Sequence, residues 1–337
     1  RFVFADRQVD FEPAAFAEDS MQLKNWNFSF GLRFDHYGFV VHQSAWSPRV
    51  AISRYFAGLA VLVHADYDRV FQTPAMENLL LASSPEIDQI NPLVVRLPVE
   101  PSRGNYYELG VTKGIQGRVR LDVNVFRRTF RNFADDDTLL NTGVSFPIAI
   151  AHATINGIEG KLTLPRWGRF SSSISYSNQE ATGQGPITGG LFIGAEATRE
   201  LTDNNTFSLS QDQRNTASAN LRYQATSRFW LATESSYGSG LPVELDTGNT
   251  DYGFLLAQYG PEILSRVDFA RGRVRPTYSI DAGAGFDLYK KESRTASVQI
   301  QGSNLTNHLN VINFASLFSG TAVAMPRSYG LRLQASF

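Results

Sequence analysis

The chain has 337 residues, and its 31 Lys and Arg residues nearly balance its 32 Asp and Glu residues, which gives a formal net charge of −1. This balance argues against nucleic-acid binding, which needs a basic surface, and the lack of cysteine excludes disulfide scaffolds, Cys-ligated zinc, iron–sulfur clusters and cysteine nucleophiles. No segment resembles a transmembrane helix, which needs about 20 mainly apolar residues, so the strand pattern decides between a soluble and a membrane-spanning β protein.

The clearest pattern along the chain is an alternation of apolar and polar residues with a period of two. Between residues 118 and 125, Val119 and Leu121 alternate with Arg120 and Asp122. The same alternation recurs at residues 170–178, 217–224, 278–288 and 329–337. This period is typical of β-strands that have one apolar and one polar face.

We therefore predict an all-β chain of about fourteen strands. The predicted strands cover residues 2–7, 14–23, 26–36, 46–56, 58–69, 105–115, 117–130, 152–165, 168–180, 213–226, 227–240, 276–290, 293–304 and 326–337. No stable helix is predicted, because short helical patches such as residues 75–81 fall between strands.

Short and long connections alternate along these strands. Tight turns are expected at residues 56–58, 115–117, 165–168, 226–227 and 290–292. Long polar loops are expected at residues 70–104, 131–151, 181–212, 241–275 and 305–325. In a meander of hairpins, alternate connections lie at the same end of the sheet, so all the long loops would share one end. Transmembrane barrels have this asymmetry, with short periplasmic turns and long extracellular loops.

The predicted strands are also longer than is usual in soluble proteins. Most of them reach the about 9–11 residues that cross a bilayer at a tilt, whereas strands of globular proteins are commonly about 5–6 residues long. The sequence therefore predicts an antiparallel transmembrane β-barrel, closed so that every backbone polar group is bonded, with apolar residues toward lipid and polar residues toward the lumen. An interfacial girdle would include the aromatic residues near strand ends: Tyr55, Phe56, Trp167, Phe170, Phe229, Tyr289 and Tyr329.

Six stretches are more specific than the alternation. They are Trp26–Tyr37, Ser47–Arg49, Asp66–Asn78, Tyr106–Gly110, Asn156–Gly160 and Gly302–Asn307, followed by a closing strand that ends at Phe337. In this order and spacing, they make the chain resemble the C-terminal part of the β-barrel of TonB-dependent outer-membrane receptors. The resemblance covers nearly the whole chain.

Members of that family look like 22-stranded barrels whose lumen is filled by an N-terminal plug. The resemblance implies that residues 1–337 supply about the last fourteen strands, and that the plug, the TonB box and the first strands lie outside this sequence. It implies an outer-membrane protein of a Gram-negative cell that is not an enzyme and needs no cofactor. The implied partners are outer-membrane lipid, the plug and remaining strands, the TonB complex, the barrel-insertion machinery and an extracellular ligand.

The implied function is TonB-dependent uptake of a scarce ligand such as a siderophore, cobalamin, a glycan or a peptide. Extracellular loops would capture the ligand, and TonB would pull on the plug to open a path through the barrel. Two alternatives stay open at this point: a passive, porin-like β-barrel channel, and a soluble all-β carbohydrate-binding module. Plug and TonB-box sequences upstream would favour uptake over a passive channel, and dependence on detergent would exclude the soluble module.

Charged residues on the polar face of the predicted strands are the candidate functional residues. We expect the following to face the lumen and the plug: Arg33, Asp35, Arg49, Glu108, Glu159, Lys161, Arg222, Glu234, Asp281, Asp287 and Arg332. On the closing strand, the resemblance implies an assembly signal that the insertion machinery would read, formed by Tyr329, Leu331, Leu333 and Phe337.

Other candidate sites are better explained without catalysis or metal binding. Asp135–Asp137 and the stretch with Asp246, Asn249 and Asp251 lack EF-hand spacing, so we interpret them as solvated loop residues, with a calcium site as the alternative. Ser239 does not lie in a nucleophile elbow. His64 is expected to contact the plug or water. None of the five histidines forms a pair with metal-ligand spacing: His36, His42, His64, His152 and His308.

Overall fold

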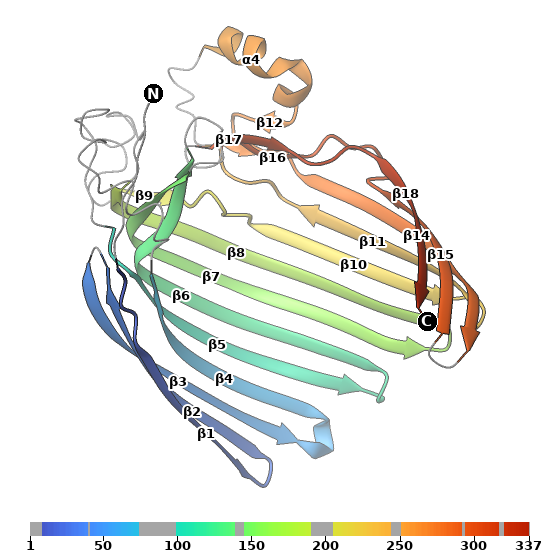
Figure 1. The fold of residues 1–337 in the computed structure, drawn as a ribbon, viewed down its shortest axis with the longest axis horizontal. Coiled ribbons are helices and arrows are strands. Elements are labelled where there is room, and N and C mark those ends of the chain that lie inside the picture. Colours follow the sequence, from blue (N-terminus) through green and yellow to red (C-terminus); the bar gives the residue numbers. More distant parts are fainter. Residues whose placement is uncertain are drawn as a thin grey trace.

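The computed structural model describes residues 9–39, 41–73, 99–138, 145–189, 205–243, 251–291, 294–316 and 320–336. One large antiparallel sheet dominates this part of the chain and curves strongly (Figure 1). The sheet has 14 strands, and its order follows the sequence from β1 at one edge to β18 at the other. The described strands therefore form a curved wall, as expected for an antiparallel barrel.

The main path of the sheet matches the strands predicted from the alternation. It comprises β1 (Ala14–Leu23), β2 (Trp26–Gly38), β3 (His42–Phe56), β4 (Val61–Gln72), β5 (Ser102–Ile115), β6 (Val119–Thr138), β7 (Ser145–Trp167), β8 (Phe170–Gly189), β10 (Asn215–Gln224), β11 (Phe229–Gly238), β14 (Thr277–Lys291), β15 (Arg294–Ser303) and β18 (Ser328–Ser336). The predicted strand at residues 2–7 and the patch at 75–81 lie outside the described residues. The remaining strand of the sheet, β9 (Thr206–Ser208), pairs with β8 where a loop was predicted.

Tight turns join neighbouring strands at one end of the sheet. The turn between β5 and β6 has Gln116 at φ 50° and Gly117 at φ 62°, the two consecutive positive values of a type I′ hairpin turn. Arg118 closes the turn by donating its N–H to the carbonyl of Ile115 over 3.0 Å. Gly117 permits this reversal because glycine adopts positive φ without steric strain.

The connection between β11 and β14 contains a helix, so the prediction that the chain has no stable helix was wrong. Helix α4 (Tyr252–Leu264) lies beyond the end of the sheet that carries the long connections (Figure 1). Asp251 caps it by accepting a hydrogen bond from the N–H of Gly253 at 2.8 Å. Gly260, at φ 77°, and Pro261 kink the helix. No helix in the described residues is both long enough and apolar enough to span a bilayer.

The predicted loop at residues 131–151 is mostly regular structure. β6 and β7 continue past the expected strand ends and leave only residues 139–144 between them. The extension is stabilised by an apolar cluster that includes Ile148 and Ile150 of β7 and Leu209 after β9, all of them buried. Burial of these side chains supplies the free energy that orders a stretch whose acidic sequence resembles a loop.

Short elements also occupy the other connections. They are η1 (Ala57–Leu59), the hairpin of β12 (Val267–Asp268) with β13 (Arg273–Val274), and the hairpin of β16 (Val311–Ser316) with β17 (Gly320–Val323). α4 and the two hairpins share one core, whose buried members are Leu255, Leu264, Val267, Val274, Val311 and Phe314. The predicted loops at 241–275 and 305–325 therefore pack together at the loop end of the sheet.

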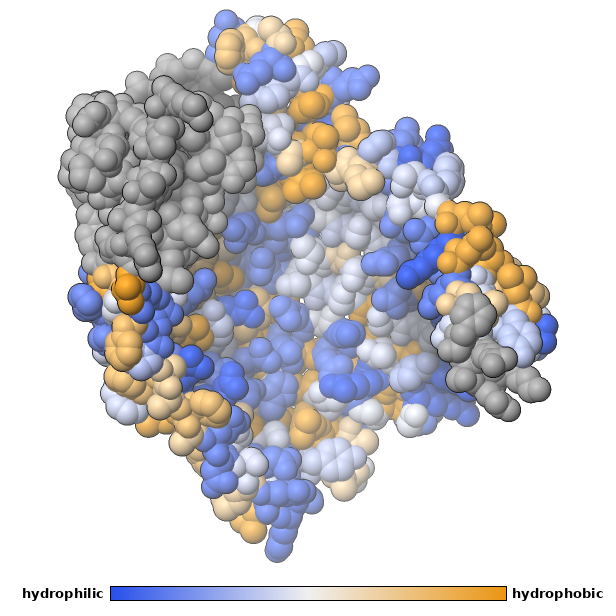
Figure 2. Space-filling model, in the orientation of Figure 1, coloured by the Kyte–Doolittle hydropathy of each residue, from blue (hydrophilic) through white to orange (hydrophobic). Residues whose placement is uncertain are grey.

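The two faces of the sheet differ in polarity, and this difference positions the candidate site. On β8, Ile174 and Tyr176 leave 49% and 47% of their surface exposed on the convex face, whereas Ser173 and Ser175 have the opposite parity. The pairing register places Ile174 beside Leu162 of β7, which continues the apolar band across strands. Figure 2 shows polar residues gathered in the hollow of the sheet. An apolar band of this extent is typical of a lipid-facing surface.

Candidate functional site

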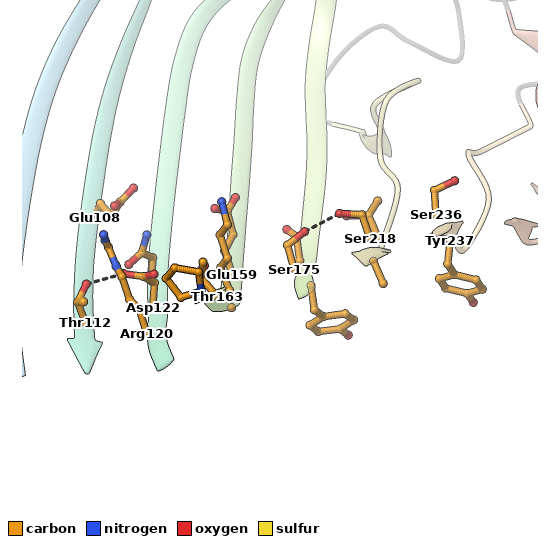
Figure 3. Close-up of a pocket in the computed structure, with 18 of the residues that line it drawn as sticks. Glu108, Thr112, Arg120, Asp122, Glu159, Thr163, Ser175, Ser218, Ser236 and Tyr237 are labelled. Atoms are coloured by element: carbon orange, nitrogen blue, oxygen red, sulfur yellow. Dashed lines mark hydrogen bonds and ion pairs between the residues drawn. The ribbon is translucent and has the colours of Figure 1, made fainter. Parts of the chain in front are cut away.

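The concave face of the sheet contains an open cavity, the bay, which has a volume of about 1000 Å³ and is lined by strands β4 to β8, β10 and β11. Its polar lining, drawn in part in Figure 3, comes from successive strands: His64, Glu108, Thr112, Arg120, Asp122, Asn124, Glu159, Lys161, Ser175, Ser218 and Ser236. These side chains meet because each occupies the polar position of the alternation on its own strand. The bay is therefore suited to water and polar ligands.

Asp122 is a well-connected carboxylate of the bay. Its Oδ1 accepts hydrogen bonds from Oγ1 of Thr112 at 2.6 Å and from Nε of Arg120 at 2.9 Å. Further along the wall, the hydroxyl oxygens of Ser175 and Ser218 are 2.7 Å apart (Figure 3). These contacts link β5 with β6 and β8 with β10, so the polar lining is held by cross-strand pairs.

Several of the predicted lumen residues lie in charge pairs. Arg33 and Asp35, at alternate positions of β2, approach to 2.8 Å. Arg49 of β3 approaches Asp68 of β4 to 2.6 Å. Because exposed ion pairs contribute little to folding free energy, these pairs mainly balance charge on the polar face. Glu108 belongs to a different group, with His64 at 3.3 Å.

The other predicted lumen residues share this parity. Arg222 stacks over the ring of Trp230 at 4.3 Å, and Glu234 of β11 lies directly opposite Asp281 of β14. Asp281 accepts a hydrogen bond from Oγ of Ser279 at 2.7 Å. Glu159 and Lys161 line the bay, Asp287 lies opposite Ser297, and Arg332 lies opposite Gln299. Contact of these residues with a plug remains a prediction.

The aromatic residues expected at the interface are divided between the two faces. Phe56 and Trp26 lie on the convex face and flank Arg54, whose guanidinium is 4.6 Å and 4.9 Å from the two ring centroids. Tyr55 shares the parity of the concave face, because its neighbours Arg54 and Phe56 face outward. The expected girdle is therefore wrong at Tyr55, where position near a strand end outweighed parity in the prediction.

The closing strand carries the predicted assembly signal on its convex side. Tyr329, Leu331 and Leu333 of β18 are 72%, 66% and 72% exposed. Their partners on β15 include Ile300. Phe337 lies outside the described residues, and recognition of this strand by the insertion machinery remains a prediction.

Two of the predicted histidines lie close together. The rings of His36 and His42 are 6.5 Å apart between centroids, and Nδ1 of His36 is 2.9 Å from Oγ of Ser44. At the loop end, His308 stacks on the ring of Tyr278 at 3.9 Å. Burial lowers the pKa of His308, and the nearby positive charge of Arg266 lowers it further.

The described acidic candidates and Ser239 lie in regular structure or stabilise it. Asp135 lies on β6 and not in a loop, and Asp251 is the cap of α4. The side chains of residues 136–137 and all of residues 246–249 lie outside the described part of the chain. Oγ of Ser239 accepts a hydrogen bond from the backbone N–H of Asn215 at 3.0 Å, which links β10 to the segment after β11.

Sequence reasoning missed a fully buried carboxylate at the loop end. Asp212 accepts hydrogen bonds from the N–H of Ala181 and from Nε of Arg214, each at 2.8 Å, and also from Arg273. Arg214 also pairs with Glu180 at 2.8 Å. No local sequence pattern predicts this network, because Arg273 comes from the connection between β11 and β14.

The family comparison matches this geometry. The model of the TonB dependent receptor-like β-barrel family covers residues 3–305. No curated protein sequence matches the chain.

Solved structures of outer-membrane receptors have a similar fold. A variant of the ferric enterobactin receptor PfeA from Pseudomonas aeruginosa is 18% identical, with a TM-score of 0.64 over 97% of this chain and 45% of that chain. The ferric-catecholate import receptor Fiu from K12 E. coli is 15% identical, with a TM-score of 0.62 over 96% and 44%. The copper transporter OprC is 11% identical, with a TM-score of 0.64 over 97% and 47%.

The chain spans less than half the length of these three proteins. Identities this low support the fold, and the family itself is established by the match over residues 3–305. The curved antiparallel sheet, with its polar concave face and apolar convex face, agrees with that match. The chain belongs to the TonB-dependent receptor family, as part of the receptor β-barrel.

Proposed function

We propose that this chain forms wall and loop surface of an outer-membrane receptor that takes up a ligand with energy supplied through TonB. The observation that carries the proposal is the opposed polarity of the two faces of the sheet. A polar bay of about 1000 Å³ lies on the concave face, and large apolar side chains are exposed on the convex face. A wall with these properties separates an aqueous path from lipid, which is what a transport barrel requires.

Helix α4 supports ligand capture at the loop end. Tyr252, Phe254 and Leu256 are 58%, 64% and 39% exposed, while Leu255 and Leu264 of the same helix are buried in the shared core. Exposed aromatic side chains on an anchored helix offer a large contact area at low cost in conformational entropy. We propose that they contact the ligand before it enters the barrel.

The chemistry of the proposed receptor is binding and release. In this proposal the plug and the earlier strands come from the rest of the protein, and the plug contacts the charged residues of the concave face. TonB acts on the plug and not on the residues of this chain. The wall contributes polar contacts and no catalytic step.

The experiment measures uptake by Gram-negative cells that express the full-length protein and lack other receptors for the ligand offered. The panel begins with ferric siderophores, because PfeA and Fiu are named as receptors for ferric ligands, and continues with cobalamin, glycans and peptides. We expect uptake of one radiolabelled ligand that stops when TonB is deleted. Uptake that continues without TonB would instead support a passive channel.

A further inference from the structure

Three side chains of types that can ligate a metal, His64, Asp66 and Glu108, meet on the concave face where β4 pairs with β5. Nε2 of His64 lies 3.3 Å from Oε1 of Glu108 and 3.7 Å from Oδ2 of Asp66. The three ligand atoms all lie within 4.8 Å of one another. A tetrahedral site with metal–ligand bonds of about 2.0–2.2 Å places its ligand atoms roughly 3.3–3.6 Å apart. The two distances from His64 are close to this spacing, and a cation would draw in the two carboxylate oxygens, which lie within 4.8 Å of each other.

The strand register brings the two carboxylates together in spite of their like charge. Asp66 and Glu108 are directly opposite each other in the β4–β5 pairing, an arrangement that is unfavourable for two negative charges. In the described part of the chain, His64 is the basic side chain within 4 Å of both carboxylates, and an imidazole balances negative charge only when it is protonated; the neighbouring Asp68 is paired with Arg49. A divalent cation would balance the remaining negative charge.

A glycine leaves room for the ring of His64 and the amide of Asn124 to lie side by side. Gly110 lies opposite His64, and a Cβ atom at this position would come within 2.5 Å of Nε2 of His64 and within 2.3 Å of Oδ1 of Asn124. Oδ1 of Asn124 is buried without a hydrogen-bond partner. An amide oxygen therefore lies at the same space and is available as a fourth ligand. Imidazole and carboxylate ligands together suit divalent cations such as Zn²⁺ and Co²⁺.

We propose that His64, Asp66 and Glu108 bind a divalent transition cation of the Zn²⁺ or Co²⁺ class on the concave wall, with Asn124 supplying a fourth oxygen. His64, Glu108 and Asn124 line the bay, so a cation reaches the site from the aqueous side of the sheet. The inference is independent of which ligand the receptor takes up and of how transport is energised. It assigns to His64 a role as metal ligand.

The experiment titrates Co²⁺ into the full-length receptor, purified metal-free in detergent and without a histidine tag. Binding is followed by calorimetry and by the visible absorption of bound Co²⁺. We expect a saturable site whose dissociation constant rises by about tenfold or more in His64→Gln and in Glu108→Gln, because each change removes a ligand. Gly110→Ala keeps all four ligand side chains, but its Cβ atom would overlap the ring of His64 and the amide of Asn124; it is expected to displace both and abolish binding at this site.

His152→Gln is the matched control, because His152 lines a separate cavity with Arg69 and Arg131; its Co²⁺ affinity should equal that of the wild type. Each variant is first tested for the heat-modifiable gel mobility of a folded barrel, and Asp66→Asn replaces any variant that fails this test. Equal Co²⁺ affinity in folded cluster variants and wild type would overturn the proposal. Absence of saturable binding by the wild type up to about 1 mM Co²⁺ would also overturn the proposal, and would leave His64 as a hydrogen-bond partner of Glu108.

Discussion

Arg273 donates a hydrogen bond to the fully buried carboxylate of Asp212, although the two residues are 61 positions apart in the sequence. A second guanidinium nitrogen of Arg273 donates to the backbone carbonyl of Asp212. Arg273 also donates to the carbonyl of Gly240 at 3.2 Å. These bonds join the segment between β9 and β10 to the long connection between β11 and β14, so the loop end of the sheet is fixed by a buried charge pair.

Asp212→Ala should therefore destabilise the folded receptor. The change leaves Arg273 partly buried without its carboxylate and the N–H of Ala181 without its acceptor, and loss of one partner of a buried pair costs about 3–5 kcal/mol. The measurement is urea unfolding of the full-length protein in lipid vesicles. Asp68→Ala is the control, because it breaks the exposed pair with Arg49 and should cost less than about 1 kcal/mol. An equal loss of unfolding free energy in the two variants would contradict the role of Asp212 as the buried carboxylate that fixes the loop end.

The pH dependence of the loop end should follow His308. Because burial and Arg266 lower the pKa of His308 in the folded protein, the unfolded chain takes up a proton first as the pH falls. The free energy of unfolding is therefore highest above the ordinary histidine pKa of about 6.5, and it decreases as the pH falls below that value. Amide hydrogen exchange around residues 304–310, corrected for intrinsic rates, should be slower at neutral pH than in mild acid. His308→Phe keeps a ring against Tyr278 and should remove the difference.

The strands of the sheet could be predicted because each has one apolar and one polar face, which imposes a period of two on its sequence. Arg120, Leu121 and Asp122 alternate in the sequence and lie on alternate faces of β6 in the structure. Helix α4 escaped prediction because Gly260 and Pro261 interrupt its pattern. The extension of β6 and β7 escaped because it depends on packing between Ile148 and residues distant in the sequence.

The contacts of the candidate site could not be predicted, because they depend on strand register. Asp66 and Glu108 are 42 positions apart, and only the β4–β5 pairing places them opposite each other. Asn304 belongs to the Gly302–Asn307 stretch, and its hydrogen bonds likewise could not be predicted from the sequence. Its amide donates to the carbonyls of His308 and Met325 at 2.9 and 3.3 Å, which ties the loop after β15 to the segment that leads into β18.

The two ends of the sheet should lie on opposite sides of the outer membrane. Residues 1–337 contain no cysteine, so a cysteine introduced here is the only one in this part of the protein, and a membrane-impermeant maleimide can report its exposure. Phe254→Cys on α4 should be labelled on intact cells, and Ser227→Cys in the turn between β10 and β11 should be labelled only after the outer membrane is permeabilised. The full-length protein without either change is the background control. Labelling of Ser227→Cys alone on intact cells would reverse the proposed orientation.

An arginine introduced on the convex face of β8 should destabilise the protein more than an arginine introduced on the concave face. Ile174 and Ser173 are consecutive residues, so they lie at nearly the same height in the sheet, and Ile174 is 49% exposed on the convex face. In lipid, Arg at position 174 would lose its hydration, and Ile174→Arg should lower the free energy of unfolding by about 2–4 kcal/mol if the site is near the bilayer midplane.

Ser173 faces the polar side, where its hydroxyl donates a hydrogen bond to Oδ1 of Asn220 at 3.1 Å. Ser173→Arg keeps its charge in contact with water and should cost less than about 1 kcal/mol, apart from the loss of this exposed bond. Folding titrations of the two full-length variants in lipid vesicles measure both costs under the same conditions. A larger cost for Ser173→Arg than for Ile174→Arg would mean that the convex face does not contact lipid.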